Sequence, residues 1–175
     1  MKNIVATLSL LFATTLSAQV AIGKTSISSP AVSLEFYDNA DNTRGIILPW
    51  VTSTAAVTGA VNGTIVYNTA DRKVYVKYAS GWRDLSVDNT GTVTTTLQDS
   101  LTDQDTAKVL IGGDPATDTT PGILVLADTN KAMVLPKVAS PHLKIVNPST
   151  GMMVYDTTKK QLAVFNGTVW SFWKP

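Results

Sequence analysis

The chain has 175 residues, of which 44% are hydrophobic and 15% charged, and its 14 Lys and Arg nearly balance its 13 Asp and Glu. This hydrophobic fraction is typical of a globular protein and excludes a chain that is disordered throughout. The near-zero net charge argues against binding to nucleic acid or to an anionic membrane, because both normally require a basic surface. Thr and Val are abundant and strong helix formers are scarce, which favours strands and turns.

The first 18 residues have the pattern of a secretory signal peptide. Lys2 gives a positive start, residues 4–16 are mostly apolar, and the small residues Ser17 and Ala18 precede Gln19. The apolar stretch is shorter than the roughly 20 residues of a spanning helix, although an uncleaved membrane anchor is the alternative. We therefore expect bacterial-type export, cleavage after Ala18, and a mature chain that is secreted or held at the cell surface without spanning the membrane. The chain has no cysteine, which excludes both disulfides and a lipid-modified cysteine.

Two segments 88 residues apart have nearly the same sequence. "GTIVYNTADRKVYVKYASGW" at 63–82 corresponds to "GMMVYDTTKKQLAVFNGTVW" at 151–170. Upstream, "GIILPWV" at 45–51 corresponds to "KAMVLPKV" at 131–138, and "VAIG" at 20–23 corresponds to "VLIG" at 109–112. This conserved order predicts a tandem duplication. We assign repeat 1 to 19–85, a Thr- and Asp-rich linker to 86–108 and repeat 2 to 109–175.

Each repeat carries strand signals. In the first, "TIVY" and "VYVKY" are β-branched and aromatic runs separated by the turn-forming "NTADRK", which predicts a hairpin. Alternation along the second run places Val74, Val76 and Tyr78 on one face, which we assign to the core. We predict an all-β fold of mainly short antiparallel strands and hairpins, with space for a short helical turn in "VTSTAAVTGAV" and in "KVASPHLKIV".

Several residues that recur in both copies are predicted to be structural. A large aromatic side chain suits the core end of each unit, and a proline without an N–H suits the end or edge of a strand. These residues are Pro49, Tyr67, Trp82, Pro136, Tyr155 and Trp170. We expect contacts specific to one copy where the two differ, at Trp50 against Lys137 and at Lys77 against Phe165.

The repeated motifs resemble a module of secreted bacterial surface proteins and phage tail fibres, which runs from "GIG" through "LLPR" and "YNT" to "NGxW". Here "AIGKTSISSP", "RGIILPWVTS", "GTIVYNT" and "ASGW" match in the first copy, and "LIGGDP", "AMVLPKVAS", "GMMVYDT" and "FNGTVW" match in the second. The chain departs from the pattern after the proline, where Trp50 and Lys137 replace the arginine. The resemblance implies an extracellular β-rich fibre or adhesin component, often trimeric in phage fibres, with no catalytic residue.

No motif in the chain predicts an enzyme, a cofactor or a metal. "AIGKTS" at 21–26 lacks the upstream glycine of a phosphate-binding loop. His142 is the only histidine, and the chain has no Gly-x-Ser-x-Gly motif to supply the serine of a hydrolytic triad. Aspartates fall in turn-like segments, where they cap the backbone with their own side chains. Calcium bound by Asp38, Asp41 or the Asp103 and Asp105 pair is the alternative, and a carboxylate-based hydrolase is also left open.

Two surface functions remain as hypotheses. Trp50 and Trp173, with Lys137, are candidate surface contacts, and exposed tryptophans would suit a secreted carbohydrate-binding module. Packing in the core or at an interface is the alternative for both tryptophans, and we favour it. Four triplets of the form Asp-Ser/Thr-small or apolar resemble bacterial O-glycosylation sites, with the candidate acceptors Ser100, Thr106, Thr119 and Thr157. We therefore expect the partners to be further copies of the chain, in an oligomer or fibre, or extracellular glycans and surface proteins.

Overall fold

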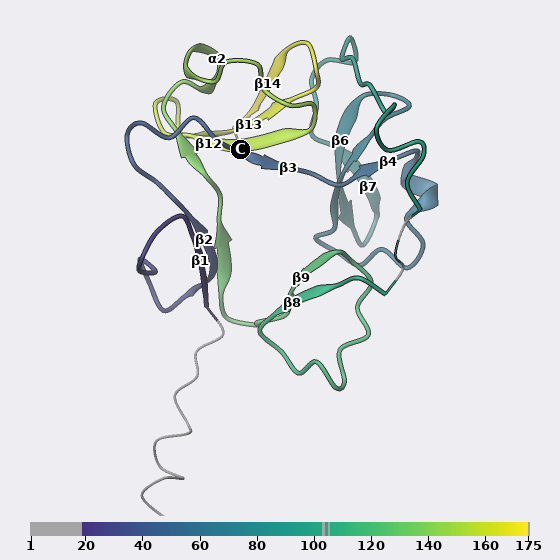
Figure 1. Ribbon diagram of the computed structural model, residues 1–175, viewed down its shortest axis with the longest axis vertical. Coiled ribbons are helices and arrows are strands. Elements are labelled where there is room, and N and C mark those ends of the chain that lie inside the picture. Colours follow the sequence, from purple (N-terminus) through teal and green to yellow (C-terminus); the bar gives the residue numbers. More distant parts are fainter. Residues whose placement is uncertain (1–18, 103, 105, 175) are drawn as a thin grey trace, which may run out of the picture.

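The structure is a computed structural model that describes residues 19–102, 104 and 106–174. Short β-strands dominate it, which confirms the all-β class (Figure 1). The strands of the first repeat are β1 (Val20–Ile22), β2 (Val32–Phe36), β3 (Ile46–Ile47), β4 (Trp50–Val51), β5 (Ile65–Asn68), β6 (Lys73–Tyr78) and β7 (Gly81–Asp84). Those of the second are β8 (Val109–Ile111), β9 (Leu124–Leu126), β10 (Ala132–Val134), β11 (Lys137–Val138), β12 (Met152–Asp156), β13 (Gln161–Phe165) and β14 (Trp170–Trp173). The predicted signal helix at 1–18 lies outside the described residues.

Both repeats place a short helical segment after their fourth strand, as the sequence predicts. The 3₁₀ helix η2 (Thr54–Ala56) follows β4, and α2 (Pro141–Lys144) follows β11. The side chain of Ser53 caps η2 by accepting a hydrogen bond from the Ala56 amide. Pro141 opens α2, where its fixed φ suits a first helical turn and its missing N–H removes no helical bond.

Strand pairing within each repeat follows one scheme. The antiparallel series β5–β6–β7 corresponds to β12–β13–β14, which confirms the predicted hairpins. Parallel pairs, which the sequence did not predict, complete the scheme: β4 beside β5, β11 beside β12, β1 beside β2 and β8 beside β9. Each parallel pair needs a longer crossover than a hairpin turn, so no local sequence signal marks it.

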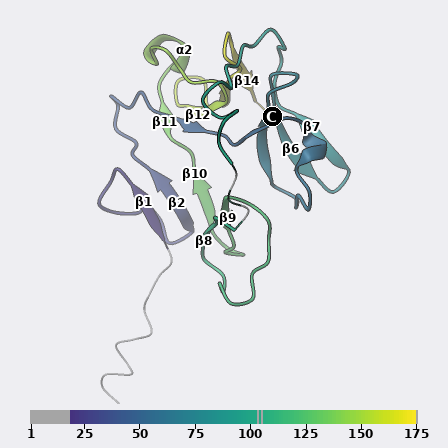
Figure 2. The same ribbon diagram turned by 45° about the vertical axis from the view of Figure 1, so that its right-hand side comes forward.

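Two further pairings join the repeats. The second repeat's β10 lies parallel to β2 of the first, and β3 of the first lies antiparallel to β12 of the second. Figures 1 and 2 both place β10 beside β2, in a different sheet from the hairpins of its own repeat. The repeats therefore exchange one strand each and interlock.

The core reflects this interlocking. One cluster of buried side chains draws on both repeats and comprises Leu48, Tyr67, Val74, Met153 and Val164. A second cluster lies within repeat 2 and comprises Val138, Ile145, Met152, Val154 and Ala163. Val74 and Val76 are buried as predicted, whereas Tyr78 is exposed. Tyr78 ends β6 opposite Gly81, which has no side chain to cover it.

Candidate functional site

Buried side chains of both repeats meet at one contact, which joins the two halves of the chain. We define the junction as Trp50, Tyr67, Gly151, Met153 and Asn166. Tyr67 is fully buried there, and its hydroxyl donates a hydrogen bond of 2.9 Å to the Asn166 carbonyl across the repeat boundary. Burial raises the pKa of Tyr67 to about 12, because the phenolate would lose its hydration. The tyrosine therefore stays neutral and can donate at any physiological pH.

Trp50 completes one side of the junction. Its ring lies against the Tyr67 ring with centroids 6.3 Å apart and planes tilted by 48°, within the range of favourable aromatic pairs. Its indole Nε1 donates a hydrogen bond of 3.1 Å to the Thr150 carbonyl of the second repeat. A residue that the sequence made a candidate surface contact is thus a half-buried contact between repeats.

A glycine allows the repeats to approach this closely. Gly151 has a φ of 78°, and a β-carbon on it would lie 3.1 Å from Trp50 Nε1 and 3.2 Å from Tyr67 Cβ. Both the left-handed backbone and the tight packing favour glycine there. The corresponding Gly63 of the first repeat also has a positive φ, but a β-carbon on it would meet nothing within 4 Å.

Asn166 holds the other side of the junction. Its Oδ1 accepts hydrogen bonds from the Thr168 and Val169 amides, which makes the Asn-Gly segment a side-chain-stabilised turn. Its Nδ2 donates to the carbonyl and carboxylate oxygens of Asp88, in the segment predicted as a linker. This part of the linker is therefore attached to repeat 2, and the buried Asn166 connects three parts of the chain.

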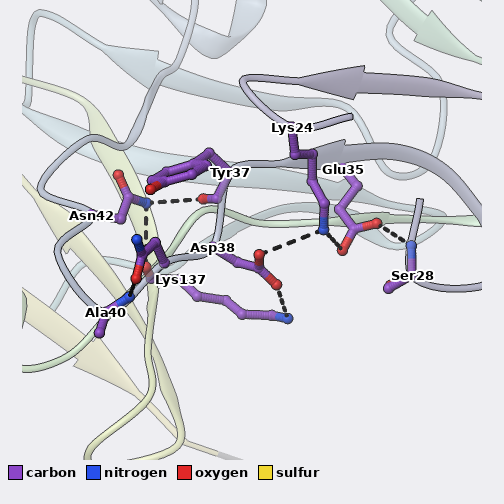
Figure 3. Close-up of polar contacts among 9 residues, drawn as sticks. Lys24, Ser28, Glu35, Tyr37, Asp38, Ala40, Asn42 and Lys137 are labelled. Carbon is purple, nitrogen blue, oxygen red and sulfur yellow. Dashed lines mark hydrogen bonds and ion pairs between the residues drawn. The ribbon is translucent and has the colours of Figure 1, made fainter. Parts of the chain in front are cut away.

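A group of charged residues forms a second connection between the repeats (Figure 3). We define the ionic cluster as Lys24, Glu35, Asp38 and Lys137. Glu35 on β2 is fully buried and accepts two hydrogen bonds of 2.7 Å, from Lys24 Nζ and from the Ser28 amide. The hydrogen bond from Lys24 lowers the pKa of Glu35 from 4.5 to about 2, against the opposing effect of burial.

Asp38 joins the two lysines of the ionic cluster. Its Oδ2 lies 3.2 Å from Lys137 Nζ and its Oδ1 lies 3.5 Å from Lys24 Nζ. The hydrogen bond from Lys137 is the main cause of the lowered pKa of Asp38. Because Lys137 begins β11 of the second repeat, the cluster ties the loop after β2 to the other repeat.

Asn42 reinforces the same loop. Its Nδ2 donates hydrogen bonds to the carbonyls of Tyr37, Arg44 and Lys137, at 3.2, 3.3 and 3.2 Å (Figure 3 draws Asn42 with Tyr37 and Lys137). Lys144 of α2 donates to the Ala40 carbonyl of that loop. The charges and amides here satisfy one another, an arrangement that suits holding two parts of a fold together.

The six residues predicted to be structural have different environments. Pro49 and Pro136 play the same part, since their carbonyls accept 2.9 Å hydrogen bonds from the amides of Tyr67 and Tyr155. The tyrosines differ, because Tyr67 is 0% exposed and Tyr155 is 36% exposed. The opposite repeat covers the first and leaves the second open. Trp82 and Trp170 are half-buried, and Trp170 packs against Phe165.

The candidate surface contacts do not form one site. Trp50 lies in the junction, Lys137 lies in the ionic cluster, and Trp173 is exposed at the end of the last strand, β14. Lys77 donates to the neighbouring Tyr78 carbonyl, while Phe165 packs beside Trp170. At the positions where the two copies differ in sequence, the equivalent side chains therefore contact different neighbours.

The candidate modification and metal positions are placed as follows. The four candidate O-glycosylation acceptors, Ser100, Thr106, Thr119 and Thr157, are all exposed. Asp38 is held in ion pairs and Asp41 is exposed, while Asp103 and Asp105 lie outside the described residues. Among the residues that are described, no three metal-ligating side chains gather. His142 is exposed and meets Phe172 edge to face, with centroids 5.6 Å apart.

Sequence reasoning missed the ionic cluster. Glu35 is the only glutamate in the chain and lies in the apolar run "VSLEF", where a buried charge requires a partner. That signal could have identified Glu35 as a buried ion-pair residue. Its partner Lys24 was considered only as a candidate phosphate ligand.

Comparison with known proteins gives one match. Residues 114–174 match the family model described as a phage tail-like trimerisation region. The matched segment runs from the loop before β9 to the end of the described chain and includes the whole β12–β13–β14 series. No curated protein and no solved structure matches the chain. In the part of the chain that the structure describes, no helix is long and apolar enough to cross a membrane.

Proposed function

We propose that this chain is an exported, non-enzymatic structural component of a fibre or surface assembly, and that it acts by associating with further copies of itself into a trimer. The observation that carries the proposal is the similarity of residues 114–174 to a phage tail-like trimerisation region. The resemblance of both repeats to tail-fibre and surface-protein modules supports the same function. The signal-like residues 1–18 support export to the outside of a bacterial cell.

The distribution of polar contacts also supports a structural role. Polar contacts described above hold one repeat to the other: the buried Tyr67 to Asn166, the buried Asn42 to Lys137, and the more exposed ion pair of Asp38 with Lys137. Such contacts stabilise one arrangement of strands. A shape maintained in this way is what a fibre component contributes to its assembly.

A secreted carbohydrate-binding module is the second candidate. Of its proposed aromatic contacts, Trp173 is exposed and available for stacking on a sugar ring, whereas Trp50 is half-buried and its indole N–H is already hydrogen-bonded. Glycan-array binding that is lost in Trp173→Ala would favour this candidate. Binding unchanged by that substitution would remove Trp173 from consideration.

Light scattering coupled to size-exclusion chromatography tests the leading proposal. The purified chain should elute as one species with about three times the mass of a single chain. If export cleaves after Ala18, the intact mass of the exported protein should equal that of residues 19–175. A larger mass would indicate glycosylation. A monomer at every concentration, with no association on a surface or polymer, contradicts the proposed function.

A further inference from the structure

The two repeats differ at one strand edge. β2 and β9 occupy the same place in their repeats, because β1 pairs with β2 through Val20 and Leu34, and β8 pairs with β9 through Val109 and Leu124. On its other side β2 carries β10. Within the described part of the chain, β9 has no strand on that side and forms only the two-stranded sheet with β8. Figure 1 shows this small sheet below the hairpin sheets of both repeats.

The side chains at these edges differ accordingly. Leu34 of β2 is 1% exposed, while the corresponding Leu124 of β9 is 47% exposed. Val109 of β8 and Ile123, which immediately precedes β9, are also exposed. An exposed apolar strand edge is a template for pairing with another chain, and natural proteins normally protect it with a charge or proline on the strand. The strand β9 itself, with the sequence LVL, carries neither.

The backbone groups of β9 also face outward. The carbonyl of Ile123 accepts from the Val109 amide, and the Ala127 amide donates to the Ile111 carbonyl, so these alternate residues face β8. Because successive residues in a strand direct their N–H and C=O groups to opposite edges, Leu124 and Leu126 direct theirs to the open edge. This is the orientation with which Leu34 meets β10 in the first repeat.

The strand that would fill this edge is identified by the same correspondence. β10 covers β2, and the segment "GIIL" at 45–48, which contains β3, corresponds to "AMVL" at 132–135, which contains β10. One edge of β3 pairs with β12, and the Leu48 amide donates to the Gly151 carbonyl on that side. Alternation therefore points the N–H and C=O groups of Ile47 away from β12, and the Ile47 side chain is 53% exposed. β3 thus has an open edge of the required kind.

A second open edge fits the same contact. β3 pairs with β12 at Met152 and Met153, which are buried. The corresponding residues of the first repeat are Thr64, just before β5, and Ile65, its first residue, and both are only partly buried. The strand equivalent to β3 is β10, whose free side would pair there. If β3 of a second copy pairs with β9 of this chain, the same arrangement therefore places β10 of this chain beside β5 of the second copy.

We propose that the open edge of β9 binds β3 of a second copy of this chain as a parallel strand, with Leu124 opposite Ile46 of that copy. The register follows from the pairing of Leu34 with Met133. The same step places Met133 of β10 opposite Ile65 of the second copy, as Ile46 lies opposite Met153 within one chain. The inference rests on the self-association proposed above and names the surfaces that carry it.

Cysteine cross-linking tests this register directly, because the natural chain has no cysteine. The double variant Ile46→Cys with Leu124→Cys is oxidised mildly and separated on a denaturing gel without reductant. Residues opposite each other on neighbouring strands are about 5 Å apart, within the range that a disulfide spans. More than half of the protein should run as covalent dimers and larger species that collapse to monomer with reductant. The pair Ile65→Cys with Met133→Cys should behave in the same way.

Matched controls isolate the register. Leu34→Cys with Met133→Cys should close a disulfide inside one chain, since these residues are paired in the fold. Ile46→Cys with Val125→Cys should give at least fivefold less cross-linked product, because Val125 points to the opposite face of β9. Each single-cysteine variant should remain mainly monomeric on the denaturing gel. Circular dichroism of every variant verifies that it is folded.

The result separates the inference from the proposed function. If light scattering gives a trimer but the 46–124 pair gives no cross-link between chains, the strand pairing is wrong and self-association stands. A 46–124 disulfide that closes inside one chain also overturns the inference, since it would mean that β9 and β3 meet within a single molecule. A chain that stays monomeric overturns both.

Discussion

The two repeats have the same order of strands, yet equivalent residues lie in different environments. Tyr67 is buried in the junction while Tyr155 is exposed, and Leu34 is covered by β10 while Leu124 is open. At the starts of β5 and β12 the order is reversed, with Ile65 partly buried and Met153 buried. The difference teaches that, at these three pairs of positions, the neighbouring repeat buries one member, whereas the second core cluster is buried within repeat 2 alone. The more exposed member of each of these pairs marks a place that the neighbouring repeat does not cover.

Truncation of the two equivalent tyrosines should give the largest difference in stability between the repeats. Tyr67→Ala removes a buried aromatic ring and its hydrogen bond to Asn166, and should lower the free energy of unfolding by about 3–5 kcal/mol. Tyr155→Ala should cost about 1 kcal/mol or less, because its ring is already partly in water. Urea unfolding at one fixed protein concentration measures both. Equal losses would show that the junction does not bury Tyr67 as described.

The ionic cluster is the next largest difference, because Val125 takes the place of Glu35 in the second repeat. Glu35→Gln leaves Lys24 without its buried carboxylate and should lower the free energy of unfolding by about 2 kcal/mol. Asp38→Asn, at a more exposed member of the same cluster, should have a smaller effect. A Glu35→Gln variant as stable as the natural chain would mean that the buried ion pair contributes nothing net.

Acid titration should give a smaller effect of the same origin. The pKa of Glu35 is lowered in the fold to about 2 from its ordinary 4.5, so its carboxylate contributes stability that is fully present above pH 4.5. That contribution should be lost as the pH falls from 4.5 towards 2. As the pH is lowered across this window, the free energy of unfolding should therefore fall less steeply in Glu35→Gln than in the natural chain. Parallel curves would show that Glu35 does not titrate with folding.

The sequence predicted the elements that depend on local signals. The hairpins follow from β-branched runs separated by turn formers, and the repeated order of motifs at offsets of 87 to 89 marks corresponding strands. The parallel pairs and the exchange of β3 and β10 could not be predicted, because they join segments far apart in sequence. For the same reason the sequence could not assign Trp50 between a surface contact and interface packing, since nothing near it in sequence reveals that Thr150 accepts its N–H.

Light scattering on the natural chain beside Leu124→Lys tests the central claim most directly. Leu124 is exposed in the single chain, so the substitution should leave the fold intact while placing a charge on the open edge of β9. Val109→Lys, on the neighbouring strand β8 of the same sheet, is the matched control. The account predicts a trimer for the natural chain and the control, and a folded monomer for Leu124→Lys. A Leu124→Lys protein that remains a trimer at the same concentration would contradict it.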